Sequence, residues 1–203
     1  MLKERILESS FGYAVWSAPV KQAKVDAIKK MLQKCGIGEN KVLDIGCGPG
    51  TNAEMFEGWD YLGVDLNPQY TEKAKIKFQG KRFICGDATR LELDGEKFPV
   101  ILINSLMHHL NDQECAQLLE GIKPLLTEKG SVIVQEPLTP APNQHLMRFL
   151  MKHDRGAYFR PLNEWQSLFE KCGLKIASDD FYVLKMAGIT GWQMYSVLLE
   201  PDR

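Results

Sequence analysis

The sequence predicts an α/β protein in which a largely parallel sheet is covered by helices on both faces. Short apolar segments rich in β-branched residues recur beyond residue 40, near 41–45, 60–65, 81–85, 99–104 and 130–136. Helical patterns separate them, near 51–57, 69–79 and 112–125. Strands that alternate with helices form βαβ units, whose connections place helices over the two faces of one sheet. With 203 residues, 44% of them hydrophobic, the chain fits a single domain over 1–203 with a full core.

The segment before the first strand divides into two parts. Apolar residues at helical spacing predict a helix within 20–34, which Gly36 ends. Residues 1–19 hold an aromatic cluster with little periodicity, including Tyr13 and Trp16. We expect residues 1–36 to form a helical segment that lies over the core 40–136, either as a lid or as an apolar staple.

The region after Glu136 begins with a proline-punctuated loop that cannot continue as a strand interior. Helices are predicted at 145–152 and 162–171, the second ended by Gly173. Two alternating segments, 174–184 and 192–200, predict a terminal pair of strands joined as a hairpin. The stretch 137–172 is the expected substrate-side insertion with the last helix.

Charge and cysteine content exclude several partner classes. The 25 basic and 26 acidic residues are well mixed and give a net charge of −1, so no nucleic-acid footprint is expected. The five cysteines have no paired spacing, which predicts reduced thiols, a cytoplasmic setting and no metal site. No apolar run or leader pattern predicts a membrane contact. The sequence does not decide between a monomer and a homodimer.

The most informative segment is Val42–Gly50, Val-Leu-Asp-Ile-Gly-Cys-Gly-Pro-Gly. Glycine at every second position after a strand allows a sharp turn and lets a ligand approach the backbone. The N–H groups of a following helix turn would face that ligand. Asp44 stands before the glycines, and a carboxylate there repels phosphate but attracts an ammonium group. An amino-acid-bearing ligand therefore fits this loop better than a pyrophosphate does.

This string resembles the first motif of the class I S-adenosylmethionine-dependent methyltransferases, in particular the small bacterial-type domains. Further segments resemble the later motifs of that family, in order: 61–67, 84–88, 98–110 and 127–134. The resemblance covers about residues 40–136. It implies a Rossmann-like three-layer sandwich whose seven-stranded sheet has the order 3-2-1-4-5-7-6, with strand 7 antiparallel. It also implies S-adenosylmethionine as cofactor and S-adenosylhomocysteine as product.

The resemblance assigns Asp44 to the methionine ammonium, Asp65 to the ribose hydroxyls and Asp87 to the adenine amino group. Asn104 and Ser105 would contact the methionine moiety through their backbone. A plain turn is the alternative for Asp87, and ordinary core packing is the alternative for Leu66 and Ala88. The full set of expected cofactor-binding residues is Asp44, Gly46, Cys47, Gly48, Gly50, Asn52, Asp65, Leu66, Asp87, Ala88, Asn104 and Ser105.

Candidate catalytic groups are His108, His109 and Glu136. An imidazole titrates near neutral pH and suits a general base, while His109 is equally suited to bracing its loop. Glu136 would orient a substrate group or pair with an arginine. Candidate substrate contacts, for which a solvated surface is the alternative, are Tyr13, Trp16, His145, Arg148, Arg155, Tyr158 and Arg160.

Three functions stay open at this point. The leading one is methyl transfer to an O, N or C nucleophile of a small-molecule acceptor, without nucleic acid or membrane. An NAD(P)-dependent oxidoreductase is favoured only by Gly48-x-Gly50-x-x-Ala53, while Asp65 follows sooner than the ~20 residues that the dinucleotide fingerprint requires. A non-catalytic S-adenosylmethionine-binding module, or transfer of another group from the same cofactor, completes the alternatives.

Overall fold

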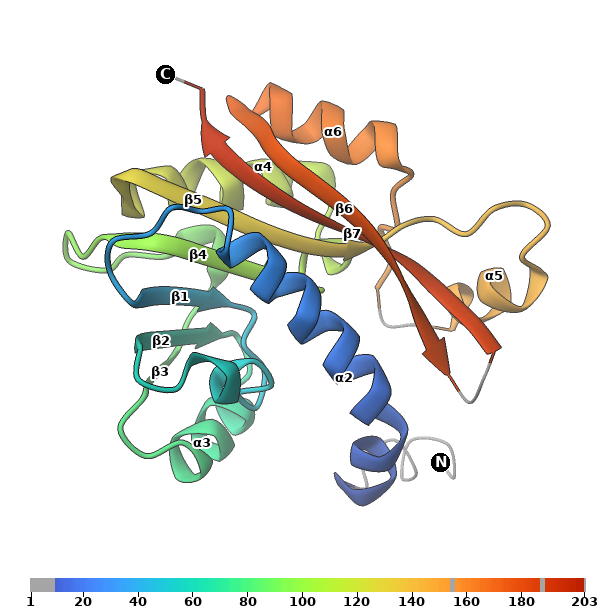
Figure 1. Cartoon of the computed structure of the whole chain (residues 1–203), viewed down its shortest axis with the longest axis horizontal. Helices are drawn as coiled ribbons and strands as arrows, with labels where there is room; N and C mark the ends of the chain where they lie inside the picture. The colour runs from blue at the N-terminus through green and yellow to red at the C-terminus, as the bar shows by residue number, and fades with distance from the viewer. Residues whose placement is uncertain (1–9, 154–155, 187–188, 203) are drawn as a thin grey trace.

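The computed structural model describes the backbone of residues 10–153, 156–186 and 189–202, and the side chains within 21–153, 156–185 and 191–202. Its centre is one seven-stranded sheet with the order β3-β2-β1-β4-β5-β7-β6 (Figure 1). The strands are β1 (Lys41–Ile45), β2 (Asp60–Asp65), β3 (Arg82–Cys85), β4 (Phe98–Asn104), β5 (Leu126–Pro137), β6 (Leu174–Met186) and β7 (Ile189–Pro201). The predicted fold class and strand order are confirmed.

The strands from β1 to β5 run parallel, whereas β7 is antiparallel to both of its neighbours, β5 and β6. The register aligns the ends of the central strands, since Ile45 pairs with Val64 on one side and with Ile103 on the other. On β5, Gln135 pairs with Asn104. The residues that follow these strands therefore meet at one edge, where α/β sheets bind their ligands.

The described part of the chain forms five α-helices: α2 (Ser10–Leu32), α3 (Pro68–Lys77), α4 (Asp112–Ile122), α5 (His145–Lys152) and α6 (Leu162–Lys171). Ile28 and Met31 of α2 pack with Phe56 and Tyr61 in the core on one face. Trp165 of α6 joins α4 in the core on the other face. Figure 1 shows α2 running diagonally across its face of the sheet. The molecule is thus a sandwich of three layers.

Two helices differ from the expected ones. The helix expected at 20–34 begins at Ser10, because the proline at position 19 removes one backbone hydrogen bond without ending the helix. The segment expected at 51–57 is a short 3-10 helix, Ala53–Phe56. Gly50 and Gly58 flank it with positive φ angles of 80° and 76°, which leaves too little chain for a regular α-helix. In the described part of the chain, no helix is long and apolar enough to cross a membrane.

Candidate active site

The glycine loop after β1 turns through three left-handed residues. Gly46, Gly48 and Gly50 have φ angles of 75°, 55° and 80°. A Cβ at Gly46 would lie 3.1 Å from the Leu106 side chain, and one at Gly50 would lie 2.7 Å from the Phe78 ring. At Gly48 the nearest atom to a Cβ would be 4.0 Å away. Gly46 and Gly50 therefore permit close packing inside the protein, whereas Gly48 leaves its backbone open to a ligand.

Asp65 ends β2 with its carboxylate turned toward this loop. Its Oδ2 accepts the Gly48 N–H at 2.8 Å, and its Oδ1 accepts the Asn67 N–H at 2.9 Å. Each carboxylate oxygen has capacity for a further donor, and the residue is only half-buried. The neighbouring Leu66 is 71% exposed. Asp65 can thus hold the loop and accept ligand hydroxyls with the same carboxylate.

Asp44 is fully buried and bonded to its own chain. Its carboxylate accepts the Tyr61 hydroxyl at 2.6 Å and the Asn52 amide N–H at 3.2 Å. Burial is the main cause that raises the pKa of Asp44 to about 6, and the charge of Asp65 adds to the rise, while the two hydrogen bonds oppose it. Cys47 turns its side chain into the core, so only its backbone belongs to the loop.

Asp87 follows β3 and caps the short helix Ala88–Arg90. Its Oδ1 accepts the backbone N–H of Thr89 at 2.9 Å and the Thr89 hydroxyl at 2.8 Å, and these bonds lower the pKa of Asp87. The carboxylate is therefore an exposed, ionised acceptor. Ala88 packs against the edge of the core. The turn interpretation and the adenine-contact interpretation of Asp87 both stay open.

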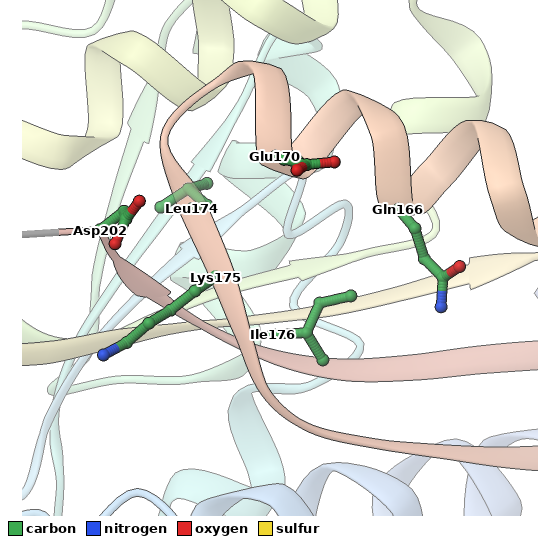
Figure 2. Close-up of a pocket in the computed structure, with 6 residues that line it drawn as sticks. All are labelled: Gln166, Glu170, Leu174, Lys175, Ile176 and Asp202. Carbon is green, nitrogen blue, oxygen red and sulfur yellow. The ribbon is translucent and has the colours of Figure 1, made fainter.

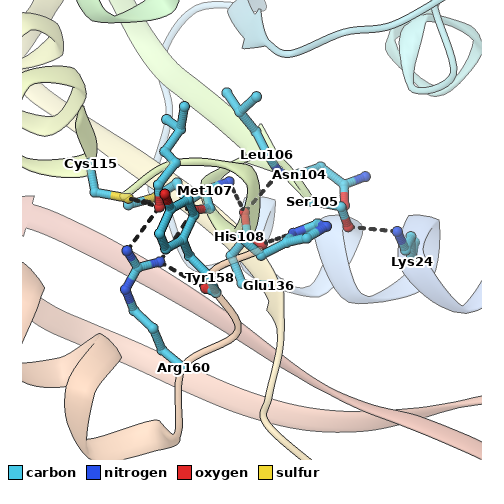
Figure 3. Close-up of polar contacts among 11 residues, drawn as sticks. Lys24, Asn104, Ser105, Leu106, Met107, His108, Cys115, Glu136, Tyr158 and Arg160 are labelled. Carbon is cyan, nitrogen blue, oxygen red and sulfur yellow. Dashed lines mark hydrogen bonds and ion pairs between the residues drawn. The ribbon is translucent and has the colours of Figure 1, made fainter. Parts of the chain in front are cut away.

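The end of β4 joins the glycine loop to α2. The Asn104 amide donates to Asn52 Oδ1 at 3.0 Å. Ser105 has a φ of 57°, which is uncommon for a residue other than glycine, and its N–H bonds the Gln135 carbonyl at 2.8 Å. Lys24 of α2 donates to the Ser105 hydroxyl at 2.6 Å (Figure 3). No local sequence pattern predicts this contact, because the two residues lie 81 positions apart.

Glu136, at the end of β5, organises the loop that follows β4. Its Oε1 accepts the N–H groups of Leu106 at 2.9 Å and Met107 at 2.7 Å, and its Oε2 lies 2.6 Å from His108 Nδ1 (Figure 3). Glu136 and His108 are buried, with 1% and 6% of their surface exposed. His109 is exposed, and its ring lies 4.2 Å from that of His108. The buried glutamate therefore fixes His108 in orientation.

Arg160 also holds the loop that follows β4, through hydrogen bonds to its backbone carbonyls. Its side chain is 5% exposed and donates to the Asp112 carboxylate at 2.6 Å and 2.9 Å. It also donates to the carbonyls of Met107, Tyr158 and Leu110. These five hydrogen bonds match the five N–H groups of a guanidinium. The geometry therefore favours a structural role for Arg160 over the substrate contact expected from the sequence.

The other expected substrate residues are spread along the segment after β5. His145 is exposed on α5, and Arg148 is half-buried and donates to the Pro140 carbonyl at 3.2 Å. Tyr158 is 43% exposed, and its N–H bonds the His108 carbonyl at 2.9 Å. Arg155 and the side chains of Tyr13 and Trp16 lie outside the described residues.

Two further sets of contacts, one at His108 and one at Asp44, had no signal in the sequence. The Phe159 ring lies 5.2 Å from the His108 ring and stacks on Trp192 at 6.1 Å. Tyr61, the strongest partner of Asp44, is 17 positions away from it. Aromatic residues in strands are usually core residues, so the sequence pattern could not separate these from the rest of the core.

A surface groove beside α6 lies away from this edge. It is lined by Gln166, Glu170, Leu174, Lys175, Ile176 and Asp202 (Figure 2). Leu174 begins β6 and pairs with Pro201, at the amino-terminal end of the parallel strands. In the part of the chain with described side chains, no group of three His, Cys, Asp or Glu residues is placed to hold a metal ion. The carboxyl edge is thus the candidate site.

Comparison with known families matches residues 42–130 to the family described as a methyltransferase domain. By this match, residues 42–130 form a methyltransferase domain. A solved SAM-dependent methyltransferase from Methanosarcina mazei shares the fold with a TM-score of 0.72 at 15% identity, covering 85% of this chain and 98% of that one. The glycine loop and the ends of β1 to β4 all fall within the matched methyltransferase segment.

Curated relatives extend the match beyond the methyltransferase domain. Caffeate O-methyltransferase-like protein 2 of Oryza sativa subsp. japonica is 27% identical over 169 residues, which are 77% of this chain and 47% of that protein. Strychnine O-methyltransferase of Strychnos nux-vomica is 28% identical over 156 residues, 68% of this chain and 41% of that protein. The chain thus spans less than half the length of these two relatives.

Proposed function

We propose that this methyltransferase domain binds S-adenosylmethionine and directs its methyl group to a hydroxyl oxygen of a small-molecule acceptor. The observation that carries the cofactor assignment is the placement of Asp65. Its carboxylate reaches from the end of β2 to the Gly48 N–H, beside the point where the loop backbone is open. A pair of ribose hydroxyls is the donor set that such a carboxylate accepts.

The remaining groups at the edge fit the same cofactor. Asp87 offers an ionised, exposed acceptor for the adenine amino group, and Leu66, which follows Asp65, offers an exposed apolar side chain. Asp44 supplies negative charge for the methionine ammonium. A nicotinamide dinucleotide would bring a pyrophosphate toward Asp44, which opposes its binding.

When bound, the cofactor would supply an electrophilic methyl group on a sulfonium. The chain would supply a base, orientation and exclusion of water. The Glu136 carboxylate accepts a hydrogen bond from His108 Nδ1 in the tautomer that carries the proton on that nitrogen, and this bond orients the imidazole. His108 would then be the residue that takes the proton of the acceptor hydroxyl. The exposed His109 is the alternative base.

The O-methyltransferase names of the curated relatives support a hydroxyl acceptor. The ring of Phe159, which lies 5.2 Å from that of His108 and 6.1 Å from that of Trp192, supports an acceptor with a flat apolar part. A small-molecule acceptor, the lack of a nucleic-acid or membrane partner and the cytoplasmic setting remain predictions from the sequence.

A thermal-shift comparison of S-adenosylmethionine, S-adenosylhomocysteine, NAD and NADP tests the cofactor assignment. A ligand at ~100 times its dissociation constant stabilises the folded state by ~2.7 kcal/mol. We expect the two adenosyl compounds alone to raise the melting temperature. A response to a nicotinamide dinucleotide alone would overturn the assignment. Binding without methyl transfer to any member of a hydroxyl-bearing aromatic panel would favour the non-catalytic module.

A further inference from the structure

A line of side-chain hydrogen bonds joins helix α2 to the buried end of β1. Lys24 Nζ donates to Ser105 Oγ at 2.6 Å, and that hydroxyl donates to Asn104 Oδ1 at 3.2 Å. Asn104 Nδ2 donates to Asn52 Oδ1 at 3.0 Å, and Asn52 Nδ2 donates to Asp44 Oδ2 at 3.2 Å. Figure 3 shows the outer end of this line, where Lys24 reaches Ser105 beside Asn104.

All of these bonds donate in the same direction, from an ammonium group toward a carboxylate. Aligned hydrogen bonds polarise one another and strengthen the last acceptor bond. The alignment also fixes both asparagine amides, because turning either one would place a donor against a donor or an acceptor against an acceptor. A cation on α2 is therefore connected electrostatically to Asp44 through oriented dipoles.

The backbone conformation of Ser105 also indicates that its contacts have a functional role. Ser105 is held at a φ of 57°, a conformation that costs free energy for a side-chain-bearing residue and that persists where surrounding contacts enforce it. The hydrogen bonds of its hydroxyl to Lys24 and Asn104 are such contacts. Strain of this kind concentrates at functional sites.

We propose that Lys24 is a positioning residue, which acts through Ser105 and the two asparagines to keep the Asp44 carboxylate ionised and oriented for a ligand ammonium group. The identity of the ligand rests on the proposed function. The line itself is a property of the ligand-free protein. Ligand binding at the glycine loop is then coupled to the packing of α2 on the sheet, because Lys24 belongs to α2 and also orients Asp44.

Carbon-13 NMR titration of the Asp44 carboxyl in the full chain tests the line without any ligand. The titratable groups that face Asp44 are the Tyr61 hydroxyl and the Asp65 carboxylate of β2 and the Cys47 thiol of the loop, and none of them is altered. Lys24→Met and Ser105→Gly should each raise the titration midpoint by about 0.5–1 pH unit. Glycine accepts the φ of Ser105, so the second variant breaks the line without straining the fold.

Lys21→Met is the matched control, because Lys21 also lies on α2 and bonds Glu54 at 2.6 Å outside the line. The titration midpoint of Asp44 in the Lys21→Met variant should equal that in the wild type. Unchanged midpoints in both Lys24→Met and Ser105→Gly, or an equal shift in Lys21→Met, would overturn the proposal.

Calorimetric titration with S-adenosylhomocysteine gives the second readout. Each line variant should bind about tenfold more weakly than the wild type. The double variant should bind no more weakly than the weaker single variant, because both substitutions break one line. Additive losses would overturn the proposal. A wild type that binds no S-adenosylhomocysteine would overturn the proposed function alone, since the NMR titration still decides the line.

Discussion

The β1–β2 side and the β4–β5 side of the sheet edge both carry carboxylates, but they use them differently. On the first side, half-buried Asp65 accepts one backbone N–H on each oxygen and keeps capacity for ligand donors. On the second side, buried Glu136 gives one oxygen to two backbone N–H groups and the other to His108. The arrangement at Asp65 is suited to binding a ligand, and the arrangement at Glu136 is suited to orienting a base.

This difference separates the expected effects of mutation. A group that keeps acceptors for a ligand should affect affinity when it is removed, with little effect on turnover at saturation. A group that holds its own chain in place should affect turnover or stability. The two sides can therefore be distinguished by measuring affinity, turnover and unfolding free energy on the same variants.

The largest expected effect is on turnover at His108. His108→Ala should lower kcat by about 10²- to 10⁴-fold, the usual contribution of general-base catalysis, with little change in the affinity for S-adenosylhomocysteine. The check is steady-state kinetics with an acceptor from the hydroxyl panel. His109→Ala, the matched control, should change kcat by less than about threefold. Loss of turnover in the His109 variant alone would show that His109, and not His108, is the base.

The next effect is on stability, at Arg160. Arg160→Ala removes five hydrogen bonds, to three backbone carbonyls and to Asp112, so it should lower the free energy of unfolding by about 3 kcal/mol. Urea titration measures this. Arg148→Ala, which removes a single bond to a carbonyl, should cost less than about 1 kcal/mol. An Arg160 variant of normal stability that fails to bind the acceptor would restore the substrate-contact interpretation.

On the β1–β2 side, Asp65→Ala should weaken S-adenosylhomocysteine binding by ~1–3 kcal/mol through loss of charge-assisted hydrogen bonds. Isothermal calorimetry gives the value. Asp60→Ala, at the other end of β2 and paired with Arg82, should bind as the wild type does. Equal S-adenosylhomocysteine affinity in the two variants would show that Asp65 does not bind the ribose hydroxyls.

The smallest effect is a pH dependence at Asp44. With a pKa raised to about 6, the carboxylate loses its charge as the pH falls, so S-adenosylhomocysteine should bind about tenfold more weakly at pH 5 than at pH 7. The folded state holds this proton between the ordinary value of 3.8 and about 6, so stability falls as the pH rises through that window. Asp44→Asn should therefore be more stable than the wild type above pH 6, bind more weakly and lose this pH dependence.

The sequence predicted the elements whose signals are local. The strand at 41–45 and the helices at 145–152 and 162–171 have the expected bounds, because chain breakers such as Pro161 and Gly173 lie beside the helix ends. The predicted start of α2 was wrong, because residues 1–19 show little helical periodicity although the helix begins at Ser10. The site partners of the β4–β5 side could not be predicted. Arg160 meets Asp112 across 48 positions, and no local pattern encodes that distance.

The central claim is that the β1–β2 side of the sheet edge receives the ligand while the β4–β5 side orients a base. Amide NMR during titration with S-adenosylhomocysteine tests it most directly. We predict large chemical-shift changes for the N–H groups of Gly48 and Asn67, which bond Asp65, and small changes for that of Met107, which bonds Glu136. Shifts centred on Met107 with Gly48 and Asn67 unchanged would place the ligand on the β4–β5 side and contradict this account.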